Sequence, residues 1–148
     1  MSSLGLVFDA AMQADLMQDE GVKLVAYPDS RGFLTIGIGR MIDERKGGGI
    51  SVAEAKMLCD NDVSARVVSL INALPWFASL DPVRQSALVN VAFNLGVNGL
   101  LEFHKMLAAV AAGDWVTATD ELHASLWATQ VQASRVSRIA RYLETGVR

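Results

Sequence analysis

The sequence has few of the residues that form disulfides or bind metals. It contains one cysteine, Cys59, and two histidines among 148 residues. A single cysteine excludes an internal disulfide and a zinc cluster built from several thiolates. His104 and His123 stand far apart, outside any metal-ligand spacing. We therefore expect no metal and no cofactor, a buried helical thiol at Cys59, and surface or capping roles for both histidines.

The sequence also lacks a basic excess, a secretory signal and a long apolar run. Its formal net charge is -3, and nucleic-acid-binding proteins usually carry a basic face, so no nucleic-acid partner is expected. The N-terminus has no early Lys or Arg and reaches Asp9 before any long apolar stretch, unlike a signal peptide. The longest uncharged stretch, Gln85 to Leu101, includes Asn, Gln, Ser and Gly, which favours a buried helix over a membrane span. These absences predict a soluble protein made in a cytoplasm.

The composition that remains is typical of a globular domain. Hydrophobic residues make up 51% of the chain and charged residues 20%, and this length suffices to bury an independent core. We expect one domain, 1–148, of mostly helical α+β class with two lobes. The small lobe covers about 15–55, and the helical lobe covers about 56–148 together with the N-terminal helix.

Apolar spacing and turn residues predict a helix, a hairpin and then several helices. The first helix runs from Asp9 to about Asp19 and stops at Gly21. The sequence PDSRG lies between two apolar stretches and predicts a β-hairpin. The glycine-rich segment 43–51 reads as a loop, and Ser51 with Glu54 makes a capping box. The strands are expected at 24–27 and 33–38, and further helices at 52–70, from Asp81 as N-cap with Pro82 first, and at 100–111, 115–125 and 133–144.

Three polar residues around the hairpin suit acid–base chemistry. Glycoside hydrolysis by inversion needs one proton donor and one carboxylate that activates water. Glu20 lies at the C-terminal end of a helix, where the helix dipole favours its protonated form. Asp29, in a polar turn, is expected to stay ionised. Thr35 offers a hydroxyl to hold water, although each residue taken singly also fits a plain structural role.

The spacing Glu20, eight residues, Asp29, five residues, Thr35 lies within DEGVKLVAYPDSRGFLTIGIG. It resembles the catalytic signature of the phage-type lysozymes, glycoside hydrolase family 24. The resemblance continues in order through GISVAEAKMLCDNDV, SLDPVRQSALVNVAFNLGVNGLLEFHKML and ATQVQASRVSRIARYLETG. It implies a two-lobe fold that cleaves peptidoglycan between N-acetylmuramic acid and N-acetylglucosamine. In the implied roles Glu20 is the general acid, Asp29 positions or activates water, and Thr35 holds it.

The resemblance also implies a substrate-binding set: Gly39, Met41, Phe93 and Asn94. Asn94 replaces a longer Gln of the family, and Met106 stands where the family often has a Ser that faces the cleft. Arg40 occupies the position of a family His that pairs with an Asp, and the matching Asp here is Asp62. An Arg40–Asp62 ion pair and a solvated Arg40 are both open.

Other aromatic and basic residues have plainer interpretations. Trp76, Trp115 and Trp127 are expected to be buried aromatics of the helical lobe rather than sugar-stacking platforms. Arginines recur every three residues on the last helix, which favours a solvated helix face over contacts with anionic wall polymers. These arginines are Arg135, Arg138 and Arg141.

Three functions remain open from the sequence. The first is a phage endolysin, a monomeric lysozyme that waits in the host cytoplasm and needs a separate holin to reach the peptidoglycan. The second is a virion-associated lysozyme used at infection, which would more often be one domain of a larger structural chain. The third is a non-catalytic wall-binding or helical interaction module, which the intact Glu20, Asp29 and Thr35 set disfavours.

Overall fold

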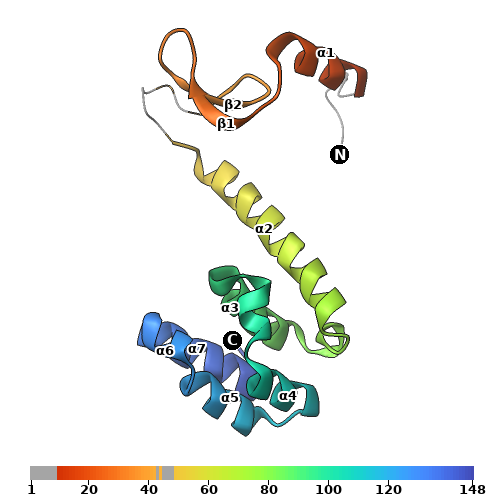
Figure 1. Ribbon diagram of the computed structural model, residues 1–148, viewed down its shortest axis with the longest axis vertical. Helices are drawn as coiled ribbons and strands as arrows, with labels where there is room; N and C mark the ends of the chain where they lie inside the picture. The colour runs from red at the N-terminus through yellow and green to blue at the C-terminus, as the bar shows by residue number, and fades with distance from the viewer. Residues whose placement is uncertain (1–9, 43, 45–48) are drawn as a thin grey trace. The chain divides into compact units, whose positions relative to one another are not determined.

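The computed structural model describes residues 10–42, 44 and 49–148. Most of the predicted loop 43–51, and residues 1–9 at the N-terminus, therefore lie outside the described residues. The chain divides into two compact units, Met1–Lys56 and Met57–Arg148. We call them the small unit and the helical unit, and each is described by itself (Figure 1).

The described residues form seven α-helices, one 3₁₀ helix and one three-stranded antiparallel sheet, which confirms the mostly helical α+β class. No helix in this part of the chain has the length and hydropathy to span a bilayer. The elements are α1 (Ala10–Glu20), β1 (Lys23–Pro28), β2 (Leu34–Gly37), β3 (Arg40–Met41), α2 (Val52–Ala73), η1 (Phe77–Ser79), α3 (Pro82–Leu101), α4 (His104–Ala112), α5 (Trp115–His123), α6 (Leu126–Gln130) and α7 (Ala133–Thr145).

The small unit consists of α1 and the sheet, with β2 as the central strand. Helix α1 stops where predicted, because Gly21 takes a φ of 71° and its N–H donates to the carbonyl of Met17 at 3.1 Å. The hairpin of β1 and β2 is confirmed. Strand β3 was not predicted, because two residues are too short to show a strand period. In the register, Thr35 lies opposite Tyr27 on β1 and Met41 on β3.

Helix α2 begins at the predicted capping box. The backbone N–H of Ser51 donates to Glu54 at 2.9 Å, and the N–H of Glu54 donates to the Ser51 hydroxyl at 3.2 Å. The guanidinium of Arg40 also binds Glu54, with Nε donating at 2.8 Å. The sequence left an Arg40–Asp62 ion pair and a solvated Arg40 open. Within the small unit Arg40 pairs with Glu54, and within the helical unit Asp62 pairs with Arg66 at 3.8 Å, one turn along α2.

The capping box also sets the charge of Glu54. Donation by the Ser51 backbone and hydroxyl, followed by Arg40, lowers the pKa of Glu54 from 4.5 to about 2. Because this pKa is lower in the folded state, the ionised carboxylate stabilises the fold above pH 4.5, and that contribution is lost as the pH falls through about 2.

In the helical unit, α3 carries much of the core. Its N-cap is Asp81, whose carboxylate accepts from the N–H groups of Val83 and Arg84 at 3.0 Å, as predicted. The helix buries only one face in the core. On its other side Phe93 and Leu95 are 39% and 36% exposed. The buried residues of this unit form one cluster, and its largest fully buried side chains are Phe77, Leu70, Leu88, Leu100, Met106, Leu122, Ile139 and Leu143.

Several expectations about this unit need correction. Cys59, expected to be a buried thiol, is exposed on α2. The helix predicted to start at Leu100 starts later, because α3 continues to Leu101 and α4 begins only at His104. Helix α6 was not predicted, since it has only five residues.

The arginines and tryptophans also differ from expectation in part. Arg135 is half-buried and donates to the side chain of Asn90 at 2.9 Å, so it is not part of a solvated face. Arg138 and Arg141 are exposed, as predicted. Trp127 is 2% exposed, which confirms it as a buried aromatic, whereas Trp76 and Trp115 are half-buried.

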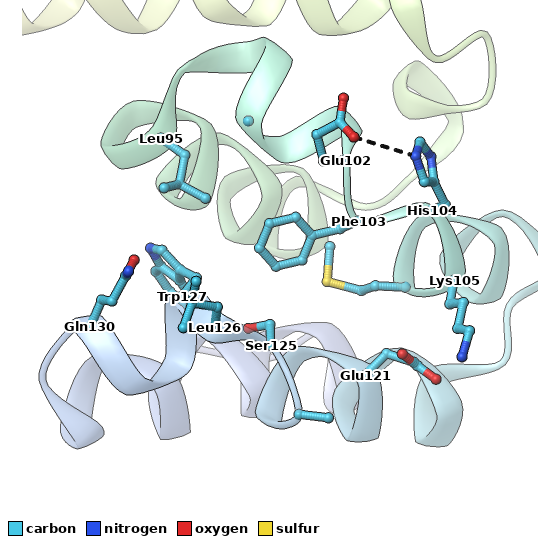
Figure 2. Close-up of a pocket in the computed structure, with 13 residues that line it drawn as sticks. Leu95, Glu102, Phe103, His104, Lys105, Glu121, Ser125, Leu126, Trp127 and Gln130 are labelled. Atoms are coloured by element: carbon cyan, nitrogen blue, oxygen red, sulfur yellow. Dashed lines mark ion pairs between the residues drawn. The ribbon is translucent and has the colours of Figure 1, made fainter.

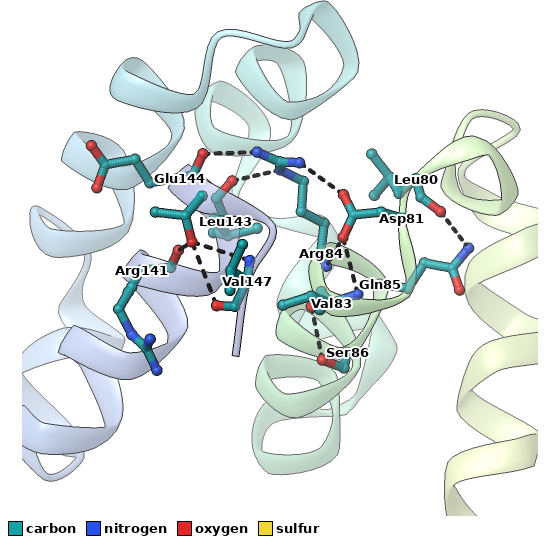
Figure 3. Close-up of polar contacts among 11 residues, drawn as sticks. Leu80, Asp81, Val83, Arg84, Gln85, Ser86, Arg141, Leu143, Glu144 and Val147 are labelled. Carbon is teal, nitrogen blue, oxygen red and sulfur yellow. Dashed lines mark hydrogen bonds and ion pairs between the residues drawn. The ribbon is translucent and has the colours of Figure 1, made fainter.

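Arg84 joins the end of α7 to the start of α3 (Figure 3). Its guanidinium donates to the carbonyls of Leu143 and Glu144 at 2.7 Å each, and to the carboxylate of Asp81 at 2.8 Å. It also lies 3.9 Å from the centre of the Trp115 ring. One side chain therefore satisfies two carbonyls at the end of α7 and holds them against the start of α3.

We predict that Arg84→Ala lowers the free energy of unfolding by about 2–4 kcal/mol, since the carbonyls of Leu143 and Glu144 and Oδ2 of Asp81 lose their guanidinium donor. Arg84→Lys should lose less, because one ammonium replaces only part of the planar fork. Arg138→Ala, an exposed arginine of α7, is the control and should change stability by no more than about 0.5 kcal/mol. Denaturant titration measures all three, and equal stability of the Arg84→Ala and Arg138→Ala variants would contradict the prediction.

Candidate active site

The turn between β1 and β2 is built by the side chain of Asp29. Its Oδ1 accepts hydrogen bonds from the backbone N–H groups of Arg31 at 2.8 Å and Phe33 at 2.9 Å. The backbone of Asp29 closes the same turn, donating to the carbonyl of Phe33 at 2.8 Å and accepting from Gly32 at 2.9 Å. An aspartate folds back on its own backbone in this way because its side chain is short.

These hydrogen bonds fix the charge of Asp29 as well as its direction. The Phe33 N–H, then the Arg31 N–H and the charge of the Arg31 guanidinium, lower the pKa of Asp29 below its ordinary value of 3.8, against an opposing effect of burial. The guanidinium lies 3.6 Å from Oδ2. Asp29 is therefore ionised at neutral pH, and Oδ2 is the oxygen that the backbone N–H groups leave free.

Thr35 lies in the middle of the sheet. Thr35 is 5% exposed, and its hydroxyl donates to the carbonyl of Phe33 at 3.3 Å. Phe33 thus contacts both polar residues, since its N–H binds Asp29 and its carbonyl binds Thr35. Met41, opposite Thr35 on β3, is half-buried.

Glu20 is the last residue of α1 and is exposed. Its carboxyl has no hydrogen-bond or ion-pair partner within the described part of the small unit. The carboxyl lies against the backbone of Gly39, where a Cβ would come within 2.7 Å of Oε2 and 2.9 Å of Cδ. The two acids of the small unit therefore have different environments: Asp29 is held by backbone donors, and Glu20 packs against a glycine at the negative end of a helix.

The remaining predicted substrate contacts belong to the helical unit. Phe93 is 39% exposed, and the guanidinium of Arg66 lies 4.4 Å from its ring centre. It borders a hollow of about 460 Å³ between α2 and α3 that Cys59 also lines. Asn94 accepts a hydrogen bond from the indole N–H of Trp127 at 2.8 Å. Its amide oxygen is thus already engaged, which the sequence did not indicate.

A larger hollow of about 650 Å³ lies beside that indole (Figure 2). Phe103, Trp127 and the buried Met106 supply apolar walls, and Glu102, which pairs with His104 at 3.6 Å, lies at its edge. Met106 therefore offers an apolar surface here. Among the described residues, no group of three or more His, Cys, Asp or Glu side chains is placed to hold a metal ion.

Two contacts near the predicted site were missed from the sequence. One is the packing of Glu20 on Gly39, and the other is the bond of Arg40 to Glu54. The first had no sequence signal, because a glycine in a Gly-x-Gly turn shows no preference for one neighbour. The second had a partial signal, since the capping box marks Glu54 as a fixed carboxylate.

Comparison with known proteins gives one family. Residues 17–140 match the family described as Phage lysozyme. The chain is 32% identical, over 92% of its length, to the pre-baseplate central spike protein Gp5 of Enterobacteria phage T4, and spans 28% of that protein. It is 30% and 31% identical, over 88% of its length, to the probable T4-type lysozymes 1 and 2 of Dictyostelium discoideum, and spans 92% of each.

The family match covers most of the chain and includes Glu20 at the end of α1 and the hairpin with Asp29 and Thr35. The resemblance identified from the sequence is therefore confirmed. The chain belongs to the phage lysozyme family, a family of glycoside hydrolases.

Proposed function

We propose that the protein is a lysozyme that hydrolyses the β-1,4 bond between N-acetylmuramic acid and N-acetylglucosamine in peptidoglycan. The observation that carries this proposal is the contrast between the two acids. Backbone N–H groups of Arg31 and Phe33 hold Asp29 in its ionised form, while Glu20 has no such donors within the described small unit. Glycoside hydrolysis needs one carboxylate and one carboxylic acid, and the family match supports it.

Glu20 is the general acid of this reaction. It donates its proton to the glycosidic oxygen as the bond to the anomeric carbon breaks. A water molecule attacks the opposite face of the sugar and gives a proton to Oδ2 of Asp29, so the anomeric configuration inverts. Thr35 donates its own hydroxyl hydrogen to Phe33, which leaves its oxygen free to accept a hydrogen bond from that water.

Gly39, Met41, Phe93 and Asn94 are the proposed substrate contacts. The exposed face of Phe93 suits the apolar side of a sugar ring. The indole N–H of Trp127 occupies the amide oxygen of Asn94, so the NH₂ group of Asn94 is the part that donates to the sugar. In this proposal the four residues contact peptidoglycan. The protein uses no cofactor and binds no nucleic acid.

The favoured biological role is that of an endolysin. The protein would be a monomer that stays in the host cytoplasm until a separate holin gives it access to peptidoglycan in the periplasm. A virion-associated lysozyme used at infection is the second candidate. The observation in its support is the match to the phage T4 spike protein. A holin gene beside this gene would support lysis, and tail genes would support use at infection. A non-catalytic wall-binding module is the third and least favoured.

We predict that Glu20→Gln lowers the rate of peptidoglycan clearing by about 10²–10⁴-fold, because an amide cannot supply the proton. Turbidity of chloroform-treated Gram-negative cells or of purified peptidoglycan measures the rate, and thermal unfolding checks that the variant folds. Glu144→Gln, an exposed acid of α7, is the control and should clear at the native rate. Equal clearing by the Glu20→Gln variant and the native protein would reject Glu20 as the acid.

The charge of Asp29 predicts the acid limb of the pH profile. Because the pKa of Asp29 is lowered and its ionised form is the active one, kcat/KM should fall only below pH 3.8. Arg31→Ala removes an exposed guanidinium and keeps both backbone donors. It should therefore move the pH at which kcat/KM falls only slightly upward. An acid limb of the folded native protein well above pH 4 would contradict the role of Asp29 as the ionised carboxylate.

The stereochemistry of the product gives a separate test. If Asp29 activates water, the sugar released first must carry the inverted, α, anomeric configuration. Proton NMR of a soluble peptidoglycan fragment, recorded before mutarotation, distinguishes the anomers. Release of the β anomer would mean that a covalent intermediate forms, and the water-activating role of Asp29 would be wrong.

A further inference from the structure

We propose that Gly39 is a positioning residue for the carboxyl of Glu20, and that a glycine is needed there because the acid occupies the space of a side chain. This inference rests on the proposed role of Glu20 as the general acid. It gives Gly39 a second role in addition to the substrate contact already proposed.

The contact involves three atoms of Glu20. A Cβ at Gly39 would lie 2.7 Å from Oε2, 2.9 Å from Cδ and 3.1 Å from Cγ. Carbon atoms in favourable contact are about 3.5–4.0 Å apart, so these distances exclude any Cβ while the carboxyl keeps its place. The backbone of the β2–β3 turn is thus the surface on which the end of Glu20 rests.

Gly37, the last residue of β2, provides a matched comparison. Gly37 has a φ of 69° and Gly39 a φ of 67°, so a side chain strains the backbone similarly at both positions. A Cβ at Gly37, however, meets no atom within 4 Å. The two positions therefore share the strain, and they differ in the contact with Glu20.

The consequence of adding a methyl group at Gly39 follows from what it would meet. The end of a glutamate side chain is flexible, so the carboxyl would turn away and the fold would be spared. A shift of about 1 Å in a reacting group can reduce the rate about 10²-fold. We therefore expect Gly39→Ala to lower the catalytic rate by more than its effect on the stability of the fold would explain.

The experiment compares Gly39→Ala with Gly37→Ala. Both variants should lose similar stability in thermal unfolding. On soluble un-cross-linked glycan fragments, kcat of the Gly39→Ala variant should be about 10–100-fold below that of the Gly37→Ala variant, because the displaced group acts on the chemical step. Any change in KM reports the substrate contact of Gly39 separately. In protein labelled with ¹³C-glutamate, the Glu20 carboxyl resonance should move in the Gly39→Ala variant and stay in place in the Gly37→Ala variant.

Three outcomes would overturn the proposal. Equal kcat in the two variants would mean that the contact with Glu20 has no effect on the reaction. A raised KM with kcat unchanged would leave Gly39 with a substrate contact alone. Unfolding of the Gly39→Ala variant where the Gly37→Ala variant stays folded would mean that the residue is structural.

The test is separable from that of the proposed function. If Glu20→Gln keeps its activity, the role of Glu20 itself fails. If Glu20→Gln is inactive and the two glycine variants behave alike, Glu20 stays the acid and only the role of Gly39 is withdrawn.

Discussion

The small unit depends on the carboxylate of Asp29. One of its oxygens accepts two backbone N–H groups, from Arg31 and Phe33, and these bonds close the turn that sets β1 against β2. The register of that pair places Thr35 in the centre of the sheet. A residue that forms a turn in this way is also held ionised and in one orientation, so the same bonds serve folding and the proposed chemistry.

The second turn of the sheet has the complementary property. It presents bare backbone at Gly39, and the carboxyl of Glu20 rests there. Asp29 is thus fixed by hydrogen bonds, and Glu20 by the shape of its neighbour. An acid that must give up its proton is better placed by packing than by donors, because donors stabilise the ionised form. The Arg40–Glu54 bond lies next along the chain, and it ties β3 to the start of α2.

The helical unit is organised around a different charged group. Arg84 binds the carbonyls at the end of α7 and the N-cap of α3, so these two helices share one guanidinium. Arg135 makes a second link from α7 to α3 through Asn90. Asn94, one turn further, receives the indole N–H of Trp127. Polar residues of α3 thus meet α6 and α7, which fixes the helix that carries Phe93.

The sequence by itself determined the class of fold, the first hairpin, the capping box, the stop of α1 and the family. These are local features: a turn aspartate, an N-cap or a helix-ending glycine acts within a few residues of itself. The spacing of Glu20, Asp29 and Thr35 belongs with them, because all three lie within one short stretch of chain.

Only the tertiary structure decided the partners of long-range groups. Arg40 binds Glu54, Arg135 turns inward, and Glu20 rests on Gly39. The physical reason is that a flexible charged side chain can reach several partners, and the path of the backbone decides which one is near. Short elements such as β3 and α6 escaped prediction for a related reason: they have too few residues for a period and form where neighbouring segments pair or pack with them.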